Sequence, residues 1–137
     1  MTASAPGAGE PITSGTLFRR IPDDVDHWVP EPEDRPASYN FIPDNKDEFL
    51  SVHWSERITP AEIFSRYPGC GLLEIPVADV WTLGYRVTCE PSESEDHAAI
   101  WGLRGAKTSA LKKLRKCVTR SWRPGTSALV ENPSRIP

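Results

Sequence analysis

Three side chains on two short segments have the chemistry needed to hold an anionic ligand. Arg20 lies in the segment LFRRI, and Ser51 and His53 stand two positions apart in FLSVHW. An arginine fork binds phosphate or carboxylate through two hydrogen bonds, and a hydroxyl orients a sugar or a ring amide. If the two segments are paired strands, these side chains converge on one side of a sheet. In the alternative, Ser51 and His53 are ordinary surface residues, and Arg19 and Arg20 pair with the nearby acids Asp23, Asp24 or Asp26.

A second group of chemically notable residues is a run of cations near the end of the chain. The formal net charge is −3, but residues 1–101 carry 18 acids and 7 bases, whereas residues 102–137 carry 1 acid and 9 bases. Clustered cations bind polyanions because binding releases condensed counterions. Alternatively, the run is an ordinary solvated face, or it lies against the acidic part of its own domain. We assign these residues to a binding surface: Arg35, Tyr39, Lys107, Lys112, Lys113, Arg115, Lys116 and Arg120.

Common catalytic and cofactor signatures are absent from the sequence. It contains no phosphate-binding glycine loop, no dinucleotide-binding glycine motif, no H-E-x-x-H, no C-x-x-C and no G-x-S-x-G. The three cysteines are widely spaced, which indicates reduced thiols rather than a disulfide framework. We therefore expect no metal site and no resident cofactor.

Several segments have the patterns of short strands and helices. Strands are predicted over 17–21, 49–54, 72–77, 85–90 and 97–101, and a short helix over 78–83. A helix is predicted over about 59–67, because Thr59 can cap it, Pro60 suits its first position, and Glu62 can return to the cap amide. A second principal helix is predicted over about 108–122, with an apolar stripe that includes Leu111, Leu114 and Trp122.

The fold class expected from these elements is α+β, with a small, mainly antiparallel sheet and two principal helices. Fourteen prolines in 137 residues argue against long helices. We expect a flexible leader over 1–16, a single domain over 17–123 that includes the basic helix, and a tail over 124–137 that could dock. No segment has 18 uninterrupted apolar residues and none has a targeting pattern, so we expect a cytoplasmic protein without a membrane anchor.

Residues 17–66 resemble the layout of RES-type toxins, which belong to the wider ADP-ribosyltransferase-like class. The resemblance is carried by an arginine on the first strand (LFRRI), a second arginine before a short extended segment (DRPASYNF), and a strand that leads into a capped helix (LSVHWSERITPAEIF). It implies NAD binding, with Arg20 on a phosphate, Tyr39 or Ser51 near the nicotinamide half, and Glu62 as an acid.

Residues 17–102 are also similar to a family of small uncharacterised bacterial proteins, and we give this similarity more weight. Three blocks carry it: Arg35-Pro36-Ala37-Ser38, Leu50-Ser51-Val52, and the block HAAIWG that begins at His97. This resemblance implies family membership but no activity.

Three hypotheses of function follow from the sequence. The leading one is a small cytosolic binding or accessory module whose basic helix contacts a polyanion, such as nucleic acid, or an acidic protein. The second is an NAD-consuming enzyme that uses Arg20, Ser51, His53 and Glu62. The third is a partner for another protein, encoded by a neighbouring gene, with Trp28 or Trp101 as exposed anchors.

Overall fold

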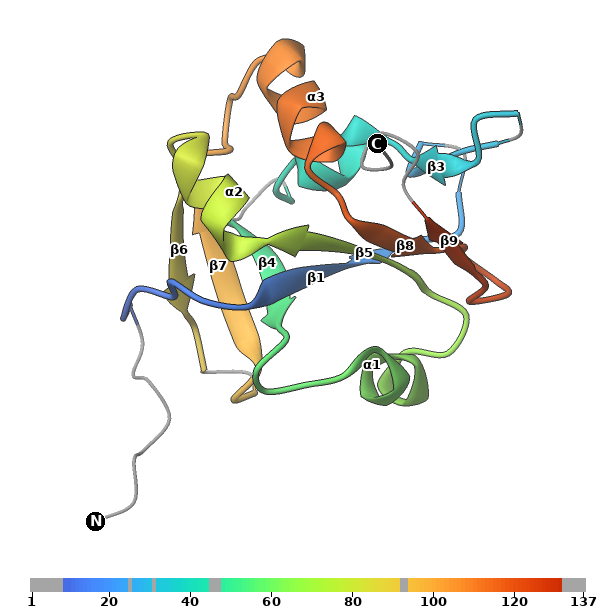
Figure 1. The fold of residues 1–137 in the computed structure, drawn as a ribbon, viewed down its shortest axis with the longest axis horizontal. Coiled ribbons are helices and arrows are strands. Elements are labelled where there is room, and N and C mark those ends of the chain that lie inside the picture. Colours follow the sequence, from blue (N-terminus) through green and yellow to red (C-terminus); the bar gives the residue numbers. More distant parts are fainter. Residues whose placement is uncertain (1–8, 25, 31, 45–47, 92–93, 132–137) are drawn as a thin grey trace.

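A seven-stranded antiparallel sheet organises the residues that the structure describes. The computed structural model describes residues 9–24, 26–30, 32–44, 48–91 and 94–131. The strand order is β6-β7-β4-β1-β5-β8-β9, and every neighbouring pair is antiparallel (Figure 1). The strands are β1 (Thr16–Ile21), β4 (Phe49–Trp54), β5 (Gly71–Pro76), β6 (Arg86–Cys89), β7 (His97–Trp101), β8 (Arg120–Trp122) and β9 (Leu129–Glu131). A separate pair joins β2 (Trp28–Val29) to β3 (Arg35–Pro36).

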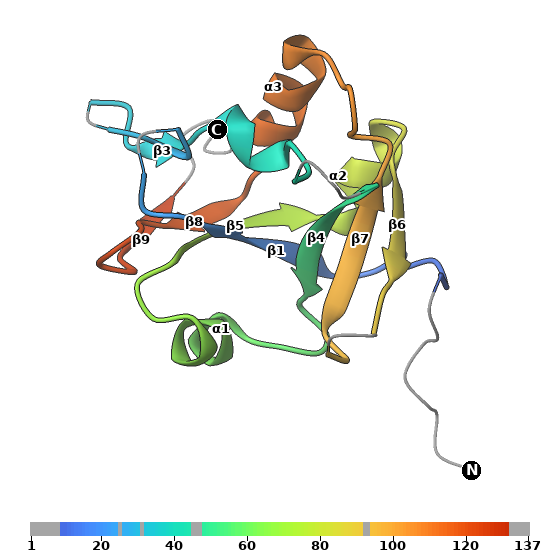
Figure 2. The same cartoon turned by 180° about the vertical axis from the view of Figure 1, so that it is seen from behind.

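Helices cover both faces of this sheet, so the predicted α+β class is confirmed. Helix α1 (Pro60–Arg66) lies on one side, while α2 (Val77–Thr82), α3 (Thr108–Lys116) and the 3₁₀ turn η1 (Ser38–Phe41) lie on the other (Figure 2). The larger apolar core lies under α2 and α3, and a smaller one lies under α1. No helix in the described ranges has the length and apolar character needed to cross a bilayer.

The predicted strands coincide closely with the observed ones, and in β4 the predicted alternation places alternate residues on opposite faces of the sheet. The bounds of β4 and β7 are those predicted, and Leu50, Val52 and Trp54 of β4 all enter the larger core, as expected from the period of two. The opposite face of β4 carries Ser51 and His53. Its polar residues are therefore placed beside α1 rather than beside α3.

Helix α1 begins where its capping signal predicts. Thr59 Oγ1 accepts a hydrogen bond from the Glu62 backbone N–H at 3.2 Å, and the Glu62 carboxylate accepts one from the Thr59 N–H at 3.2 Å. Ile63 then anchors the helix against Phe18, Leu72 and Trp122 in the smaller core. This helix positions Arg66 and Tyr67 at its C-terminal end.

Helix α3 ends earlier than the sequence pattern predicts. It stops at Lys116, and residues 120–122 form strand β8, which pairs with β5 through Leu72↔Trp122 and Glu74↔Arg120. The apolar spacing continues past Lys116, but strand pairing gives the backbone of residues 120–122 hydrogen-bond partners on β5. Trp122 is therefore a sheet residue that packs on Phe18 and Phe64, and its prediction as part of a helical stripe was wrong.

Parts of both ends of the chain belong to the packed structure. Ile12 is buried in the larger core and its N–H donates to the Val87 carbonyl at 2.9 Å, so the segment from residue 9 differs from the flexible leader predicted over 1–16. Residues 1–8 lie outside the described part. Strand β9 pairs with β8 through Trp122↔Leu129. Residues 132–137 of the predicted tail also lie outside the described part.

Replacing Leu114 by Ala tests whether α3 is an integral part of the fold. Leu114 is completely buried in the larger core, so we expect Leu114→Ala to lower the free energy of unfolding by about 2–5 kcal/mol, because the truncation leaves a cavity. The exposed neighbour Lys113 is the matched control, and Lys113→Ala should change it by at most about 0.5 kcal/mol. Urea denaturation measures both. Equal, small effects of the two variants would mean that α3 is not anchored by this side chain.

Candidate functional site

A polar site lies where strands β1 and β4 stop pairing. The two strands pair only at Leu17↔Trp54 and Phe18↔His53, whereas β1 follows β5 over its whole length. Beyond Phe18, hydrogen bonds from the Arg19 side chain replace backbone pairing between the two strands. Arg19 Nη1 donates to the Ser51 carbonyl at 2.9 Å, and Arg19 Nε donates to the Asn40 carbonyl at 3.2 Å. Arg19 therefore holds β1 and β4 apart at a fixed opening, where continued strand pairing would have closed it.

A pocket of about 520 Å³ occupies this opening. Its lining is nearly all polar and consists of Arg19, Arg20, Asp44, Ser51, His53, Arg66, Tyr67, Ser94 and His97. A neighbouring pocket of about 430 Å³ shares Arg19, Arg20 and Asp44 with it. Three arginines against one lining carboxylate give the larger pocket a positive character.

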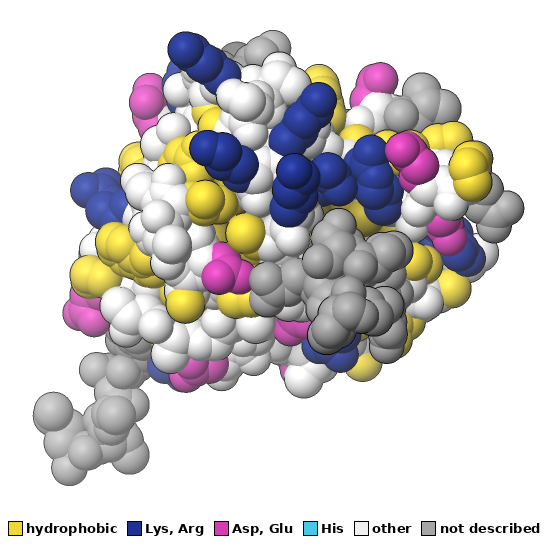
Figure 3. Space-filling view, turned by 45° about the horizontal axis from the view of Figure 1, so that its top comes forward, with side chains coloured by type: hydrophobic (Ala, Val, Ile, Leu, Met, Phe, Trp, Pro, Cys, Tyr) yellow, Lys and Arg dark blue, Asp and Glu magenta, His cyan; other side chains and the backbone are white. Residues whose placement is uncertain are grey.

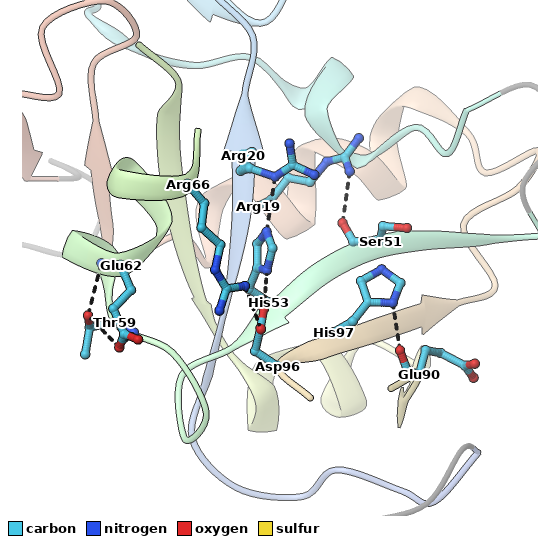
Figure 4. A network of polar contacts seen from close by, with 10 residues as sticks. All are labelled: Arg19, Arg20, Ser51, His53, Thr59, Glu62, Arg66, Glu90, Asp96 and His97. Atoms are coloured by element: carbon cyan, nitrogen blue, oxygen red, sulfur yellow. Dashed lines mark hydrogen bonds and ion pairs between the residues drawn. The ribbon is translucent and has the colours of Figure 1, made fainter. Parts of the chain in front are cut away.

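The base of the pocket is a buried histidine and carboxylate pair. His53 and Asp96 are 5% and 3% exposed, and His53 Nδ1 lies 2.6 Å from Asp96 Oδ2 (Figure 4). The other oxygen, Asp96 Oδ1, accepts a hydrogen bond from Arg66 Nη1 at 3.0 Å. The backbone holds the pair together as well, because the Trp54 N–H donates to the Asp96 carbonyl at 2.8 Å.

The second ring nitrogen of His53 determines its protonation state. Arg20 Nε, an obligatory donor, lies 3.1 Å from His53 Nε2, so Nε2 accepts and the ring proton resides on Nδ1, facing Asp96. Burial lowers the pKa of His53, and the Arg20 charge lowers it further, against the opposing effect of Asp96. Burial alone would raise the pKa of Asp96, but hydrogen bonds from His53 and Arg66 outweigh it, so this pKa is lowered.

Arg20 is held on two sides. Its Nε contacts His53, and its guanidinium carbon lies 3.8 Å from the centre of the Tyr67 ring. Within the described residues, neither Arg20 Nη has a hydrogen-bond partner. The arrangement presents a fixed cationic fork to the pocket, which suits binding of an oxyanion.

The residues proposed from the sequence as catalytic are only partly brought together. Arg20, Ser51 and His53 line the same pocket. Glu62 is not among its lining residues, and its carboxylate accepts hydrogen bonds from the Thr59 N–H and hydroxyl, at 3.2 and 3.1 Å. That position follows from the capping box itself, which turns the third residue of a helix back toward its cap.

Sequence reasoning did not identify Arg66, Tyr67 and Asp96 as site residues. Arg66 and Tyr67 lie at the end of the predicted helix, and Asp96 lies directly before the strand predicted over 97–101. Arg66 and Asp96 are 30 positions apart, so no local spacing links them. The one available signal was that Asp96 directly precedes a strand that can pair with the strand of His53.

The predicted basic surface forms on α3 and is separate from this pocket. We use the name α3 basic surface for Lys107, Lys112, Lys113, Arg115 and Lys116. With about 100° per residue, the four cations from Lys112 to Lys116 spread over roughly half of the helix circumference. The three lysines point away from Leu111 and Leu114, and Arg115 lies beside Leu111. Figure 3 shows lysine and arginine side chains gathered over the end of the molecule that carries α3.

The lysines of this surface are not neutralised by the part of the protein that the structure describes. All four lysines are exposed, and none forms an ion pair with a described residue. Arg115 is half-buried, and burial together with the nearby charge of Arg35 lowers its pKa, with Glu33 acting in the opposite direction. Arg35 itself pairs with Glu33 at 3.4 Å.

Two other residues assigned to the binding surface have different environments. Arg120 lies on β8, where its Nε donates to Glu74 Oε1 at 2.6 Å, so its charge is compensated on the sheet face opposite α3. Tyr39 lies on η1, 49% exposed, with its ring edge-on to His27. The cationic surface is therefore smaller than the sequence predicted.

The tryptophans proposed as anchors for a protein partner make their contacts within the fold. Trp28 is buried and its Nε1 donates to Asp34 at 3.1 Å, so its prediction as an exposed anchor was wrong. Trp101 is half-buried, donates to Thr88 Oγ1 at 2.8 Å and packs on Phe49. Both indole N–H groups are satisfied internally, as buried tryptophans require.

The described histidines, cysteines and acids offer no metal site. They include no group of three that could hold a metal ion. Cys70, Cys89 and Cys117 are free thiols. Burial raises the pKa of Cys70 and of Cys89, so these two sulfurs are poor thiolate nucleophiles.

The His53 and Asp96 pair predicts how stability depends on pH. Because the folded pKa of His53 lies below the ordinary value of 6.5, the unfolded chain binds more protons as the pH falls below 6.5. The stability contribution of neutral His53 should therefore be complete above pH 6.5 and decline below it. Asp96 adds a loss at still lower pH, through its own lowered pKa. Urea denaturation between pH 8 and 4.5 measures the His53 contribution, because this range lies above the ordinary aspartate pKa of 3.8.

The variant His53→Asn separates this contribution from others, because an amide can donate to Asp96 but does not titrate. We expect the pH dependence of its free energy of unfolding to be flatter between pH 6.5 and 4.5 than that of the wild type. An unchanged slope in this range would show that His53 does not titrate as the buried pair requires.

Comparison with known proteins gives no function for this chain, so its function is inferred from the geometry. No family model matches the chain, and neither a curated protein nor a solved structure does. The resemblances to RES-type toxins and to small uncharacterised bacterial proteins therefore stay predictions.

Proposed function

We propose that this protein is a binding module whose α3 basic surface contacts the phosphate backbone of a nucleic acid. The observation that carries the proposal is the set of exposed lysines on α3 that form no ion pair with the described residues. Such cations are available to neutralise the phosphates of a polyanion. A nucleic acid whose phosphates they neutralise releases its condensed counterions, and this release favours binding.

The composition of the surface favours nucleic acid over an acidic protein. The large exposed apolar side chains of the described residues are Tyr39, Ile42, Tyr67 and Leu129, and none lies on α3. Protein interfaces have cores enriched in aromatic residues and depleted of lysine. Phosphate backbones need only cations and hydrogen-bond donors, which α3 supplies.

A cytoplasmic location fits this proposal. The free thiols of Cys70, Cys89 and Cys117 suit a compartment that keeps cysteines reduced. Nucleic acid is present in the same compartment.

Salt-dependent binding tests the α3 basic surface. Wild-type protein should bind short single-stranded or duplex oligonucleotides at about 50 mM salt, and binding should weaken steeply by about 200 mM. The variant with Gln at Lys112, Lys113, Arg115 and Lys116 should bind more weakly. Its slope of log K against log salt should be smaller by roughly 0.7 to 0.9 for each phosphate that it no longer neutralises. Fluorescence anisotropy measures both quantities.

A charge-matched pair of double variants is the control. Lys112→Gln/Lys116→Gln and Arg57→Gln/Arg86→Gln each remove two positive charges, but Arg57 and Arg86 lie elsewhere, over the rings of Trp54 and Trp101. Only Lys112→Gln/Lys116→Gln should weaken oligonucleotide binding. Absence of binding at low salt, or equal effects of the two, would overturn the proposal. Tighter binding of a poly-glutamate peptide than of any oligonucleotide would indicate an acidic protein partner instead.

A second candidate function is supported by the pocket. An enzyme that consumes NAD breaks the bond between the nicotinamide nitrogen and the ribose, with water or another acceptor taking the ribosyl carbon. The observation that favours it is that Arg20, Ser51 and His53 line one pocket. Glu62, the proposed acid, is engaged at the helix cap, so such an enzyme would use other groups.

Release of nicotinamide from NAD tests the second candidate directly. Chromatography of NAD incubated with the protein should detect free nicotinamide. Arg20→Ala should reduce the rate about 10-fold or more through loss of a charged hydrogen bond. Arg57→Gln should not, because Arg57 does not line the pocket. No nicotinamide above a protein-free control would exclude this activity for NAD.

A further inference from the structure

The opening between β1 and β4 has the features of a site for a compact anion. We propose that this pocket binds the phosphate group of a small phosphorylated molecule, such as a sugar phosphate, with Arg20 as the principal contact. The site is distinct from the α3 basic surface, because none of its lining residues belongs to that surface. It requires neither nucleic-acid binding nor NAD consumption.

Arg20 is already arranged to receive an oxyanion. Its Nε donates to His53 Nε2 at 3.1 Å (Figure 4). Its guanidinium carbon lies 3.8 Å from the centre of the Tyr67 ring. These contacts fix the plane of the fork, while both Nη groups have no hydrogen-bond partner among the described residues. A side chain ordered before the ligand arrives loses little conformational freedom on binding.

A second cation and a hydroxyl lie in the same pocket. Arg66 uses one Nη to bind Asp96 at 3.0 Å, and its side chain is 45% exposed, so it keeps donors for a ligand. Ser51 adds a hydroxyl that donates to oxygen. Beside these groups, Arg19 contributes its charge.

The charge balance of the pocket favours phosphate. Arg19, Arg20 and Arg66 contribute three positive charges, Asp44 and Asp96 contribute two negative ones, and His53 is neutral in its hydrogen-bonded form. Over the described residues, the sum is one positive charge in a partly enclosed space. An anion with one or two charges compensates it, and the planar fork of Arg20 matches two phosphate oxygens.

The size and lining of the pocket indicate a polar ligand. Its volume of about 520 Å³ lies within the range of about 300–1,000 Å³ typical of small-molecule sites. Its aromatic side chains are the imidazoles of His53 and His97 and the ring of Tyr67, which already has a face covered by Arg20. A sugar with several hydroxyls therefore fits better than a second flat ring, and the adjoining pocket of about 430 Å³ gives room for it.

His53 is a positioning residue in this site. Asp96 holds the ring proton on Nδ1, which leaves Nε2 as an acceptor for Arg20. Protonation of Nε2 would convert this acceptor to a donor and release Arg20 from its position. Binding of the phosphate to the wild type should therefore weaken as His53 becomes protonated at lower pH. His53→Asn should weaken binding and make it less dependent on pH.

Calorimetric titration of the full chain with ribose 5-phosphate, ribose, inorganic phosphate and malonate tests the proposal. Ribose 5-phosphate should bind, and ribose should not. Arg20→Gln should weaken binding about 10-fold or more, and Arg20→Lys should restore only part of it, because an ammonium cannot form the two-bond fork. Arg66→Gln, on an exposed side chain, gives an independent reduction if Arg20→Gln fails to fold.

The control variants separate this site from general attraction to cations. Lys112→Gln/Lys116→Gln and Arg57→Gln/Arg86→Gln should leave ribose 5-phosphate affinity unchanged, whatever they do to nucleic acid. The assignment would be overturned if neither ribose 5-phosphate nor inorganic phosphate bound, or if malonate bound more tightly than both. It would also be overturned if the α3 double variant lost as much ribose 5-phosphate affinity as Arg20→Gln. Phosphate binding without nicotinamide release would support this site while excluding the NAD-consuming candidate.

Discussion

The buried carboxylate of Asp96 is the interaction on which the site depends. One oxygen accepts from His53 on β4 and the other from Arg66 on α1, while its backbone carbonyl accepts from Trp54. A buried charge without such partners would be costly, so the strand, the helix and the loop before β7 must meet at this point. Through His53 the same carboxylate sets the acceptor that orients Arg20 on β1. Four chain segments are thus linked to one ionised group.

The sheet separates two cationic regions of a protein with an overall negative charge. The α3 basic surface lies over the larger core, whereas the arginine pocket is lined mainly by residues of β1, of β4 and of the C-terminal end of α1. The two regions differ in physical character. The α3 lysines are exposed and strongly hydrated, which suits an extended polyanion. Arg20 is fixed by an imidazole and an aromatic ring, which suits one small anion in one orientation.

Local patterns predicted most of the secondary structure and the starts of the helices. The alternation in FLSVHW placed Ser51 and His53 together on one strand face, and the Thr59 capping box set the first residue of α1. The end of α3 was not predictable in this way. Helical spacing of apolar residues persisted through Trp122, but pairing with β5 gave the backbone of residues 120–122 partners outside the helix. Arg120 therefore lies outside the expected basic surface and forms an ion pair with Glu74.

The sequence by itself determined the α+β class, the alternation of the strands and the concentration of positive charge near α3, because these depend on residue type and on spacing within a few positions. Only the tertiary structure decided which polar groups meet. Asp96 joins Arg66 and His53 across 30 and 43 positions, and the pocket exists because β1 and β4 part after Phe18. Such contacts follow from strand register and from the burial of charge, which act between segments distant in the chain and leave no periodic trace in the sequence.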